Sequence, residues 1–193
     1  IPLLKSIGNV HLTDMGMNQL AECWRIVDTQ LRRLKIIGHH YKYDEYKQSR
    51  IGLVVPNVYS DTLIKTRVVF PEMPRKRLND LASIWTREPF YKEEGKEFRL
   101  GKDRIEGFFR YNGKDCCVNF EIDEVQDIDL LDMQEKYNVP MMDYYYKYQM
   151  RKHKFYLNME QVGFRVDFEK QKELKKTYTE MQSVVHARLV EAI

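Results

Sequence analysis

Tyr111 and Asp115 lie four residues apart in a segment whose pattern predicts a helix. One helical turn therefore places the phenol and the carboxylate on the same face. On such a face the carboxylate can hold a divalent metal ion, while the phenol orients the water that the metal activates. The pair is a candidate for metal-assisted hydrolysis, and the hypothesis gains weight if further acidic residues are found.

A second candidate carboxylate, Asp44, stands near the start of a helix predicted over residues 44–50. Residues 35–38 predict a short buried strand, so His40, Tyr43 and Asp44 follow the end of a strand and open a helix. The adjacent histidines His39 and His40 raise the alternative of a transition-metal site, but no third ligand is evident in the sequence.

The elements that must position these residues are mainly helical. Apolar residues recur at gaps of three and four over residues 13–34, with Thr13 or Asp14 as a candidate N-cap. Asp61 is a candidate cap for a helix that runs to Val69. Residues 53–55 are extended and stopped by Pro56. Further helices are predicted at residues 78–85, 105–137, 140–163 and 174–189, and residues 87–104 predict a charged loop.

Composition and length predict one main domain with an appendage. The chain has 193 residues, of which 43% are hydrophobic and 32% charged, and its net charge is +3. The mildly basic balance fits nucleic-acid binding without requiring it. Three cysteines make no disulfide framework and favour a reducing compartment. No apolar run is long enough to span a membrane, no signal peptide is visible, and both ends read as cut from a larger protein.

The order of these motifs resembles the 3′–5′ proofreading exonuclease domain of family A DNA polymerases. The second exonuclease motif of that family reads roughly Asn-x-x-Phe/Tyr-Asp, and residues 40–44 read His-Tyr-Lys-Tyr-Asp. The third motif, Tyr-x-x-x-Asp, matches Tyr111 to Asp115. Residues 159–167 resemble the Met-Glu-x-x-Gly-hydrophobic-x-Val-Asp signature at the passage from exonuclease to polymerase thumb. The resemblance spans about residues 30–193.

The sequence departs from the family pattern in two places. The opening motif of the family, Asp-x-Glu on the first strand, is absent before Gly38. Residues 167–169 contain such a motif, but they fall at the start of the thumb and do not replace it. His40 stands where the family usually has asparagine; it can still donate a hydrogen bond, with a charge that depends on pH.

The resemblance implies an α/β fold, namely a ribonuclease H-like exonuclease domain that is incomplete at its N-terminus. This domain would occupy residues 1–137. Residues 138–193 would form a connecting helix and the start of a polymerase thumb. The parent protein would be a replicative or repair DNA polymerase, and the divergent motifs favour a viral one. It would act in the cytoplasm of a bacterium or infected cell or in another reducing compartment with DNA.

The same resemblance implies two-metal hydrolysis of the terminal phosphodiester at a DNA 3′ end, with Mg²⁺ or Mn²⁺ as cofactor. Asp115 would bind one metal directly and Asp44 would act at the second. Tyr111 would orient the attacking water, and Tyr43 and His40 would support Asp44 or contact the DNA end. The implied partners are a single-stranded 3′ end or a primer–template and the rest of the polymerase polypeptide, with no membrane. Because two ligands are missing, we expect little nuclease activity from this chain alone.

Each assignment has a structural alternative. Asp44 is alternatively a helix N-cap, Asp115 a surface acid and Tyr111 a residue at the edge of the core. The run of three tyrosines at residues 144–146 is better interpreted as helix packing than as a base-stacking platform. Four lysines of the last helix are either a solvated face or contacts to DNA phosphates: Lys170, Lys172, Lys175 and Lys176.

Two alternatives remain for the function as a whole. One is a nuclease-dead ribonuclease H-like module that serves as a scaffold or a DNA-binding surface beside a polymerase. The other is an unrelated helical interaction protein in which Tyr111 and Asp115 match the motif by chance. In a two-metal site Asp44 and Asp115 must lie close together, so their separation in the folded chain distinguishes the last alternative from the others.

Overall fold

A computed structural model of the chain describes residues 6–7, 10–11, 16–89, 91 and 105–191. Helices dominate, accompanied by two small sheets. The chain divides into two compact units, Ile1–Leu157 and Asn158–Ile193. None of the helices in the described ranges combines the length and the apolar character needed to cross a lipid bilayer.

The first unit contains a parallel pair of strands joined by a helix. Strand β3 (Ile36–Gly38) pairs with β4 (Val58–Asp61), and helix α2 (Tyr41–Arg50) lies between them in sequence. This β–α–β arrangement confirms the predicted strand and the helix after it. Strand β4 was not predicted, since it is short and ends in polar residues. The second sheet is an antiparallel pair, β1 (Ser6–Ile7) with β2 (Val10–His11).

One buried carboxylate, Asp61, joins the end of β4 to two helices. Its Oδ1 accepts hydrogen bonds from the backbone N–H groups of Leu63 and Ile64, at 2.9 and 3.2 Å, at the start of α3 (Thr62–Val69). The same carboxylate accepts the N–H groups of His40 and Tyr41, at 3.1 and 2.7 Å, at the start of α2. The predicted cap is confirmed, and it serves both N-termini.

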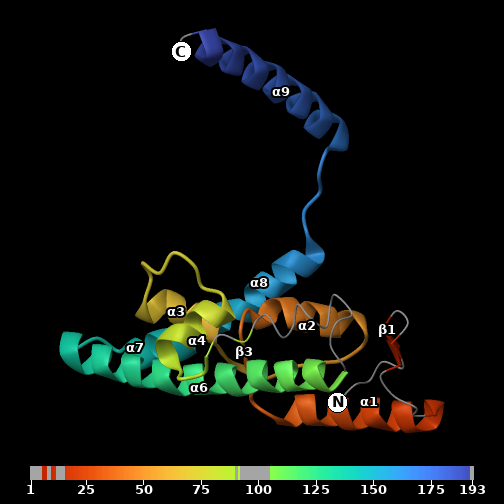
Figure 1. Ribbon diagram of the computed structural model, residues 1–193, viewed down its shortest axis with the longest axis vertical. Coiled ribbons are helices and arrows are strands. Elements are labelled where there is room, and N and C mark those ends of the chain that lie inside the picture. Colours follow the sequence, from red (N-terminus) through yellow and green to blue (C-terminus); the bar gives the residue numbers. More distant parts are fainter. Residues whose placement is uncertain (1–5, 8–9, 12–15, 90, 92–104, 192–193) are drawn as a thin grey trace. The chain divides into compact units, whose positions relative to one another are not determined.

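Helix α6 (Ile105–Tyr137) is the longest element and runs without a break. It packs against β3, α3 and α4 (Leu78–Trp85), as Figure 1 shows for the first unit. The core between α4 and α6 is made by six buried residues: Met73, Leu81, Ala82, Tyr91, Val118 and Ile122. Helix α1 (Met17–Arg33) confirms the predicted N-terminal helix; Gly16 stands at its N-cap, while Thr13 and Asp14 lie outside the described residues.

The segment after Pro140 is helical, as predicted, but it is not a uniform α-helix. It comprises α7 (Met141–Asp143), the π-helix η1 (Tyr144–Gln149) and α8 (Met150–Val162), and Gly163 follows with the positive φ of 68° expected after a helix end. Tyr145 is fully buried, and its hydroxyl lies 2.9 Å from Ser60 Oγ. Such contacts tie this segment to the first compact unit, which extends to Leu157. The domain boundary at 137/138 that the resemblance implies stays a prediction.

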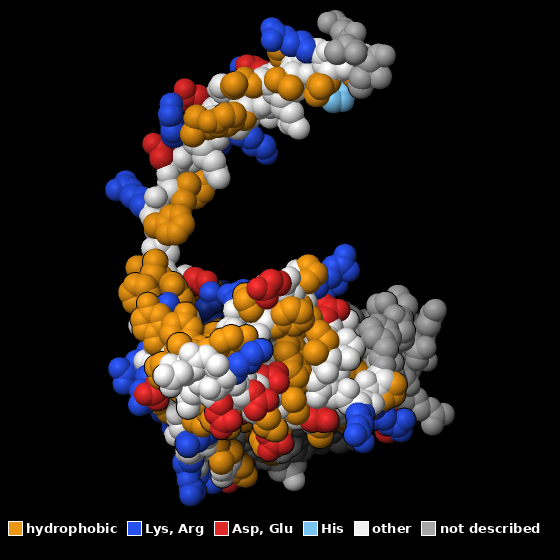
Figure 2. Space-filling model, turned by 90° about the vertical axis from the view of Figure 1, so that its left-hand side faces the viewer, with side chains coloured by type: hydrophobic (Ala, Val, Ile, Leu, Met, Phe, Trp, Pro, Cys, Tyr) orange, Lys and Arg blue, Asp and Glu red, His pale blue; other side chains and the backbone are white. Residues whose placement is uncertain are grey.

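The second unit holds the end of α8 and helix α9 (Phe168–Glu191). Asp167 Oδ1 accepts the N–H groups of Glu169 and Lys170, at 3.1 and 3.0 Å, and so caps α9. Hydrophobic side chains gather along this helix (Figure 2). Every side chain described for residues 158–190 is exposed. The apolar face predicted for the last helix therefore exists, and the second unit by itself does not bury it.

Candidate active site

A pocket of about 610 Å³ lies beside β3, between α2 and α6, and contains both predicted carboxylates. We call it the β3 pocket. Residues 34–39 form one wall, and Tyr41 and Asp44 of α2 form another. Asn112, Asp115, Cys116 and Asn119 line it from successive turns of one face of α6. Folding thus brings Asp44 and Asp115, which are distant in the sequence, to a single cavity.

The strand that borders this pocket has one sheet partner in the described part of the chain, namely β4. Its end is tightly packed, because a Cβ added to Gly38 would lie 2.5 Å from the Cβ of Tyr41. This close approach brings the first turn of α2, with Asp44, directly beside the end of β3. Glycine is therefore required at the strand-to-helix junction, for lack of room rather than for its backbone angles.

Asp44 has a perturbed carboxyl group, although the residue as a whole is exposed. Its pKa is raised above the ordinary aspartate value, principally because surrounding protein removes water from the carboxylate. The neighbouring His40 acts in the opposite direction, and the Asp61 carboxylate raises the pKa further. A raised pKa means that the folded chain disfavours the charged form of Asp44 when no cation is bound nearby.

Asp115 is half-buried and receives a hydrogen bond from a tyrosine, but not from Tyr111. The hydroxyl of Tyr91 donates to Asp115 Oδ1 at 2.7 Å. Burial, and then the bond to Asp115, raise the pKa of Tyr91, so this phenol stays protonated and acts as a donor. Tyr91 was not among the predicted site residues, because a tyrosine just beyond a charged loop has no distinctive spacing to Asp115.

Tyr111 lies at the edge of the core and does not line the β3 pocket. Its ring packs against that of Tyr91, with centroids 5.9 Å apart, and it contacts the core between α4 and α6. Tyr43 and His40 also lie outside the β3 pocket: Tyr43 is 57% exposed beneath the Lys47 ammonium, and His40 lines a second pocket. Of the five predicted site residues, two therefore share the cavity.

The donor set suits part of a metal centre. Two carboxylates provide the hard oxygen ligands that Mg²⁺ and Mn²⁺ prefer. Within the described ranges, however, no three histidine, cysteine, aspartate or glutamate side chains form a group that could hold a metal ion. Asp44 and Asp115 fit as two of several ligands, and the described residues do not supply the others.

A separate cluster of buried charges has a structural role that the sequence analysis missed. Lys65 of α3 is fully buried, and its ammonium donates to Asp123 Oδ1 at 2.6 Å and to Asp127 Oδ1 at 2.8 Å. Tyr146 also donates to Asp127, at 2.9 Å. The single ammonium and the hydroxyls of Ser60 and Tyr146 together donate to the two carboxylates, so the cluster joins α3, α6 and η1 through satisfied hydrogen bonds.

Comparisons with known proteins add no relative. No protein-family model matches the sequence, and no curated protein or solved structure matches it. A functional assignment therefore rests on the residues and their geometry.

Proposed function

We propose that this chain is part of a DNA polymerase and carries two motifs of a 3′–5′ proofreading exonuclease. The observation that carries the proposal is the meeting of Asp44 and Asp115 in the β3 pocket. They come from the two motifs that the sequence resemblance identified, and they lie on different helices. A chance match of either motif would not require the two carboxylates to line one cavity, so their shared pocket supports this proposal over an unrelated helical protein.

The architecture around the pocket is compatible with a ribonuclease H-like fold. A parallel strand pair joined by a helix, with the long helix α6 packed against β3, is a small α/β arrangement. We propose that a further strand, bearing the Asp-x-Glu motif that this sequence lacks before Gly38, belongs along β3 at the β3 pocket. Such a strand would add two carboxylates to Asp44 and Asp115.

In the proposed reaction, divalent cations supply charge neutralisation and an activated water at the scissile phosphate. Asp115 and Asp44 bind the cations through carboxylate oxygens. The Tyr91 hydroxyl donates to one oxygen of Asp115 and so helps to fix the rotamer of that carboxylate. Tyr111 would have to leave its packed position against Tyr91 to orient a water at this site.

DNA is the proposed substrate and partner, together with the remainder of the polymerase polypeptide. The net charge of +3 is compatible with a polyanionic substrate. On α9, Lys170 and Lys172 pair with glutamates one turn away at 2.8 and 2.9 Å. These exposed pairs are weak, so the lysines remain available to DNA phosphates in a polymerase thumb.

A nuclease-dead module is the second candidate, and one observation favours it. Two carboxylates line the β3 pocket, but no three histidine, cysteine, aspartate or glutamate side chains of the described residues form a group that could hold a metal ion. With that ligand set the domain would serve as a scaffold or a DNA-binding surface beside a polymerase. The two candidates differ in whether the pocket binds a divalent cation.

Binding of Mn²⁺, followed by electron paramagnetic resonance, tests the proposal on the 193-residue chain. We expect one weak site that is lost in both Asp44→Asn and Asp115→Asn, because each substitution removes an anionic ligand. Asp132→Asn is the matched control, since Asp132 is an exposed aspartate of α6 that lies outside the β3 pocket. The control should bind Mn²⁺ as the parent does.

A nuclease assay with 3′-labelled single-stranded DNA completes the test. We expect slow release of mononucleotides at best, because the chain lacks two of the expected ligands. Absence of Mn²⁺ binding, or binding that survives both substitutions, would favour the nuclease-dead module. Robust digestion by this chain would contradict the view that the site is incomplete.

A further inference from the structure

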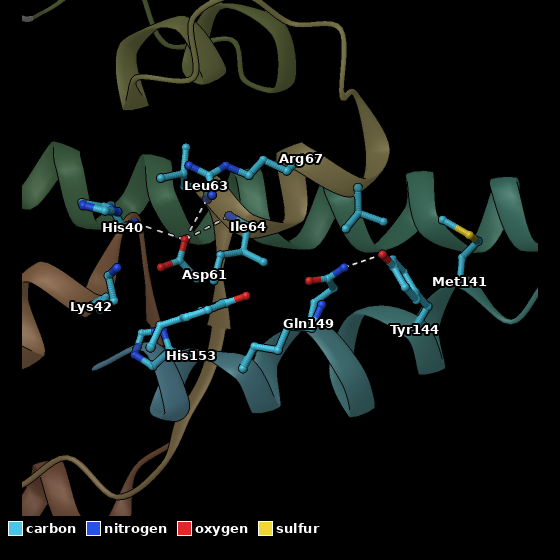
Figure 3. Close-up of a pocket in the computed structure, with 13 residues that line it drawn as sticks. His40, Lys42, Asp61, Leu63, Ile64, Arg67, Met141, Tyr144, Gln149 and His153 are labelled. Carbon is cyan, nitrogen blue, oxygen red and sulfur yellow. Dashed lines mark hydrogen bonds between the residues drawn. The ribbon is translucent and has the colours of Figure 1, made fainter. Parts of the chain in front are cut away.

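A second pocket, of about 460 Å³, lies among α2, α3, η1 and α8 in the first unit (Figure 3). Its volume lies in the range of small-molecule sites. Basic side chains from three helices meet in its lining: Lys42 from α2, Arg67 from α3 and Lys152 from α8. We call it the basic pocket.

The one carboxylate in the lining, Asp61, makes its hydrogen bonds to backbone N–H groups rather than to Arg67 or Lys152. Its two oxygens accept the backbone N–H groups that begin α2 and α3. The partial positive charges of two helix N-termini therefore offset its negative charge. Arg67 has no carboxylate partner among the residues that the structure describes, and the Lys152 ammonium rests on the Tyr148 ring, 3.9 Å from its centroid.

A buried histidine in the pocket wall has an unused polar atom. His153 is 4% exposed, and its Nε2 lies 2.8 Å from Glu45 Oε2. Its Nδ1 is buried and has no hydrogen-bond partner in the described chain. An unmet polar atom of this kind is costly in an interior, and a ligand or an ordered water that reached it would recover the cost.

The other end of the pocket is aromatic and apolar. Tyr144 and Met141 line it, and Figure 3 shows both at the end opposite His40 and Lys42. The π-helical geometry of η1 brings Tyr144 and Gln149, five residues apart, onto one side, where the Gln149 amide donates to the Tyr144 hydroxyl. Single π-helical turns of this type occur frequently at functional sites.

We propose that the basic pocket binds a mononucleotide. The phosphate lies among Lys42, Arg67 and Lys152, and the base lies against Tyr144. Cationic side chains on one side suit a dianionic phosphate, and an aromatic face on the other suits a planar base. The site is separate from the β3 pocket, needs no metal ion, and does not depend on the proposed nuclease activity.

Calorimetric titration of the 193-residue chain in the presence of EDTA tests the proposal, because chelation removes any contribution from a metal site. The probes are deoxyadenosine monophosphate, inorganic phosphate and deoxyadenosine. We expect the monophosphate to bind most tightly, phosphate more weakly and the nucleoside least. In Arg67→Ala and in Lys152→Ala, the affinity for the monophosphate should fall about tenfold or more, through loss of a charge-assisted contact.

Two matched controls remove the same charges outside the pocket. Arg50→Ala changes the exposed last turn of α2, and Lys147→Ala changes an exposed residue of η1; neither side chain lines the basic pocket. Both should bind the monophosphate as the parent does. Because Arg67 is also exposed, its truncation should preserve the fold, which circular dichroism verifies.

Three outcomes would overturn the proposal. The first is no binding of the monophosphate at millimolar concentration by the folded parent chain. The second is binding that is equally tight in Arg67→Ala, Lys152→Ala and the controls. The third is inorganic phosphate that binds as tightly as the monophosphate, since the base would then make no contact. None of these results bears on Mn²⁺ binding at Asp44 and Asp115, so the two proposals fail independently.

Discussion

Asp44 and Asp115 occupy unlike surroundings within one pocket. Asp115 is half-buried and is held by the Tyr91 hydroxyl, whereas Asp44 has a pKa raised chiefly by the loss of water around its carboxyl group. An acidic group that the folded chain disfavours in its charged form lowers stability unless a cation offsets the charge. That cost is typical of residues retained for binding rather than for folding.

Substitution Asp44→Asn should therefore preserve or slightly raise stability at neutral pH. The pKa of Asp44 is higher in the folded chain than in the unfolded chain, so ionisation favours unfolding. At about pH 3 both states are protonated and the two proteins should be equally stable. As the pH rises through the raised pKa, Asp44→Asn should become more stable than the parent, by up to about 0.5 kcal/mol since solvent screens the group.

Urea unfolding of both proteins at about pH 3 and about pH 7, below and well above the ordinary aspartate pKa, measures this difference in stability. Asp132→Asn, an exposed residue of α6, controls for the general effect of losing a negative charge. A parent chain that is clearly more stable than Asp44→Asn at neutral pH would show that the Asp44 carboxylate has a stabilising partner. Asp44 would then act as a helix residue rather than as a metal ligand.

At the scale of elements, α3 and α6 are joined by buried charges as well as by apolar packing. Lys65 reaches Asp123 and Asp127 of α6 from a fully buried position, and Ser60 Oγ donates to Asp123 at 2.5 Å. Tyr145 and Tyr146 of η1 complete the same cluster. The cluster therefore orients α6, which carries Asp115 to the β3 pocket.

Substitution Lys65→Met should destabilise the first unit strongly. Methionine approximates the volume of lysine but leaves the buried Asp123 carboxylate without its counter-charge, a loss of about 3–5 kcal/mol. Lys147→Met is the matched control, because Lys147 forms an exposed pair with Asp143 and should cost less than about 0.5 kcal/mol. Urea denaturation measures both variants, and a loss at Lys65 no larger than the control would mean that the buried charges contribute nothing.

At the scale of the whole molecule, the two units differ in how they are stabilised. The first unit has buried cores and a polar cluster between its helices. The second unit consists of helix and connecting chain whose described side chains are all exposed. Within the second unit no packing removes this apolar face from water, so inside that unit α9 depends on its own helical hydrogen bonds and its Asp167 cap.

A shortened chain that ends at Gly163 should keep the stability of the first unit. Because the first unit has buried cores of its own, its free energy of unfolding in urea should match that of the full chain to within about 0.5 kcal/mol. Far-ultraviolet circular dichroism should lose the helical signal of α9 alone. A large fall in the midpoint, or loss of a cooperative transition, would show that the first unit needs residues 164–193.

Local pattern determined most of the helices and their ends. Apolar spacing located α1, α4 and α6, the Asp61 side chain predicted the start of α3, and Gly163 marked the end of α8. These features depend on neighbours within a few residues, which the sequence contains directly. Strand β4 and the π-helix η1 escaped prediction, because a four-residue strand and one π-helical turn depend on distant partners such as Tyr145.

The sequence by itself determined which residues were candidates for chemistry; the tertiary structure decided which of them meet. The spacing of Tyr111 and Asp115 predicted that they act as a pair, because one helical turn places both on one face. In the folded chain the Tyr111 ring packs against the Tyr91 ring, and the Tyr91 hydroxyl donates the hydrogen bond to Asp115. Asp44 met Asp115 because the β3–α2 junction packs against α6, a long-range contact that no local pattern encodes.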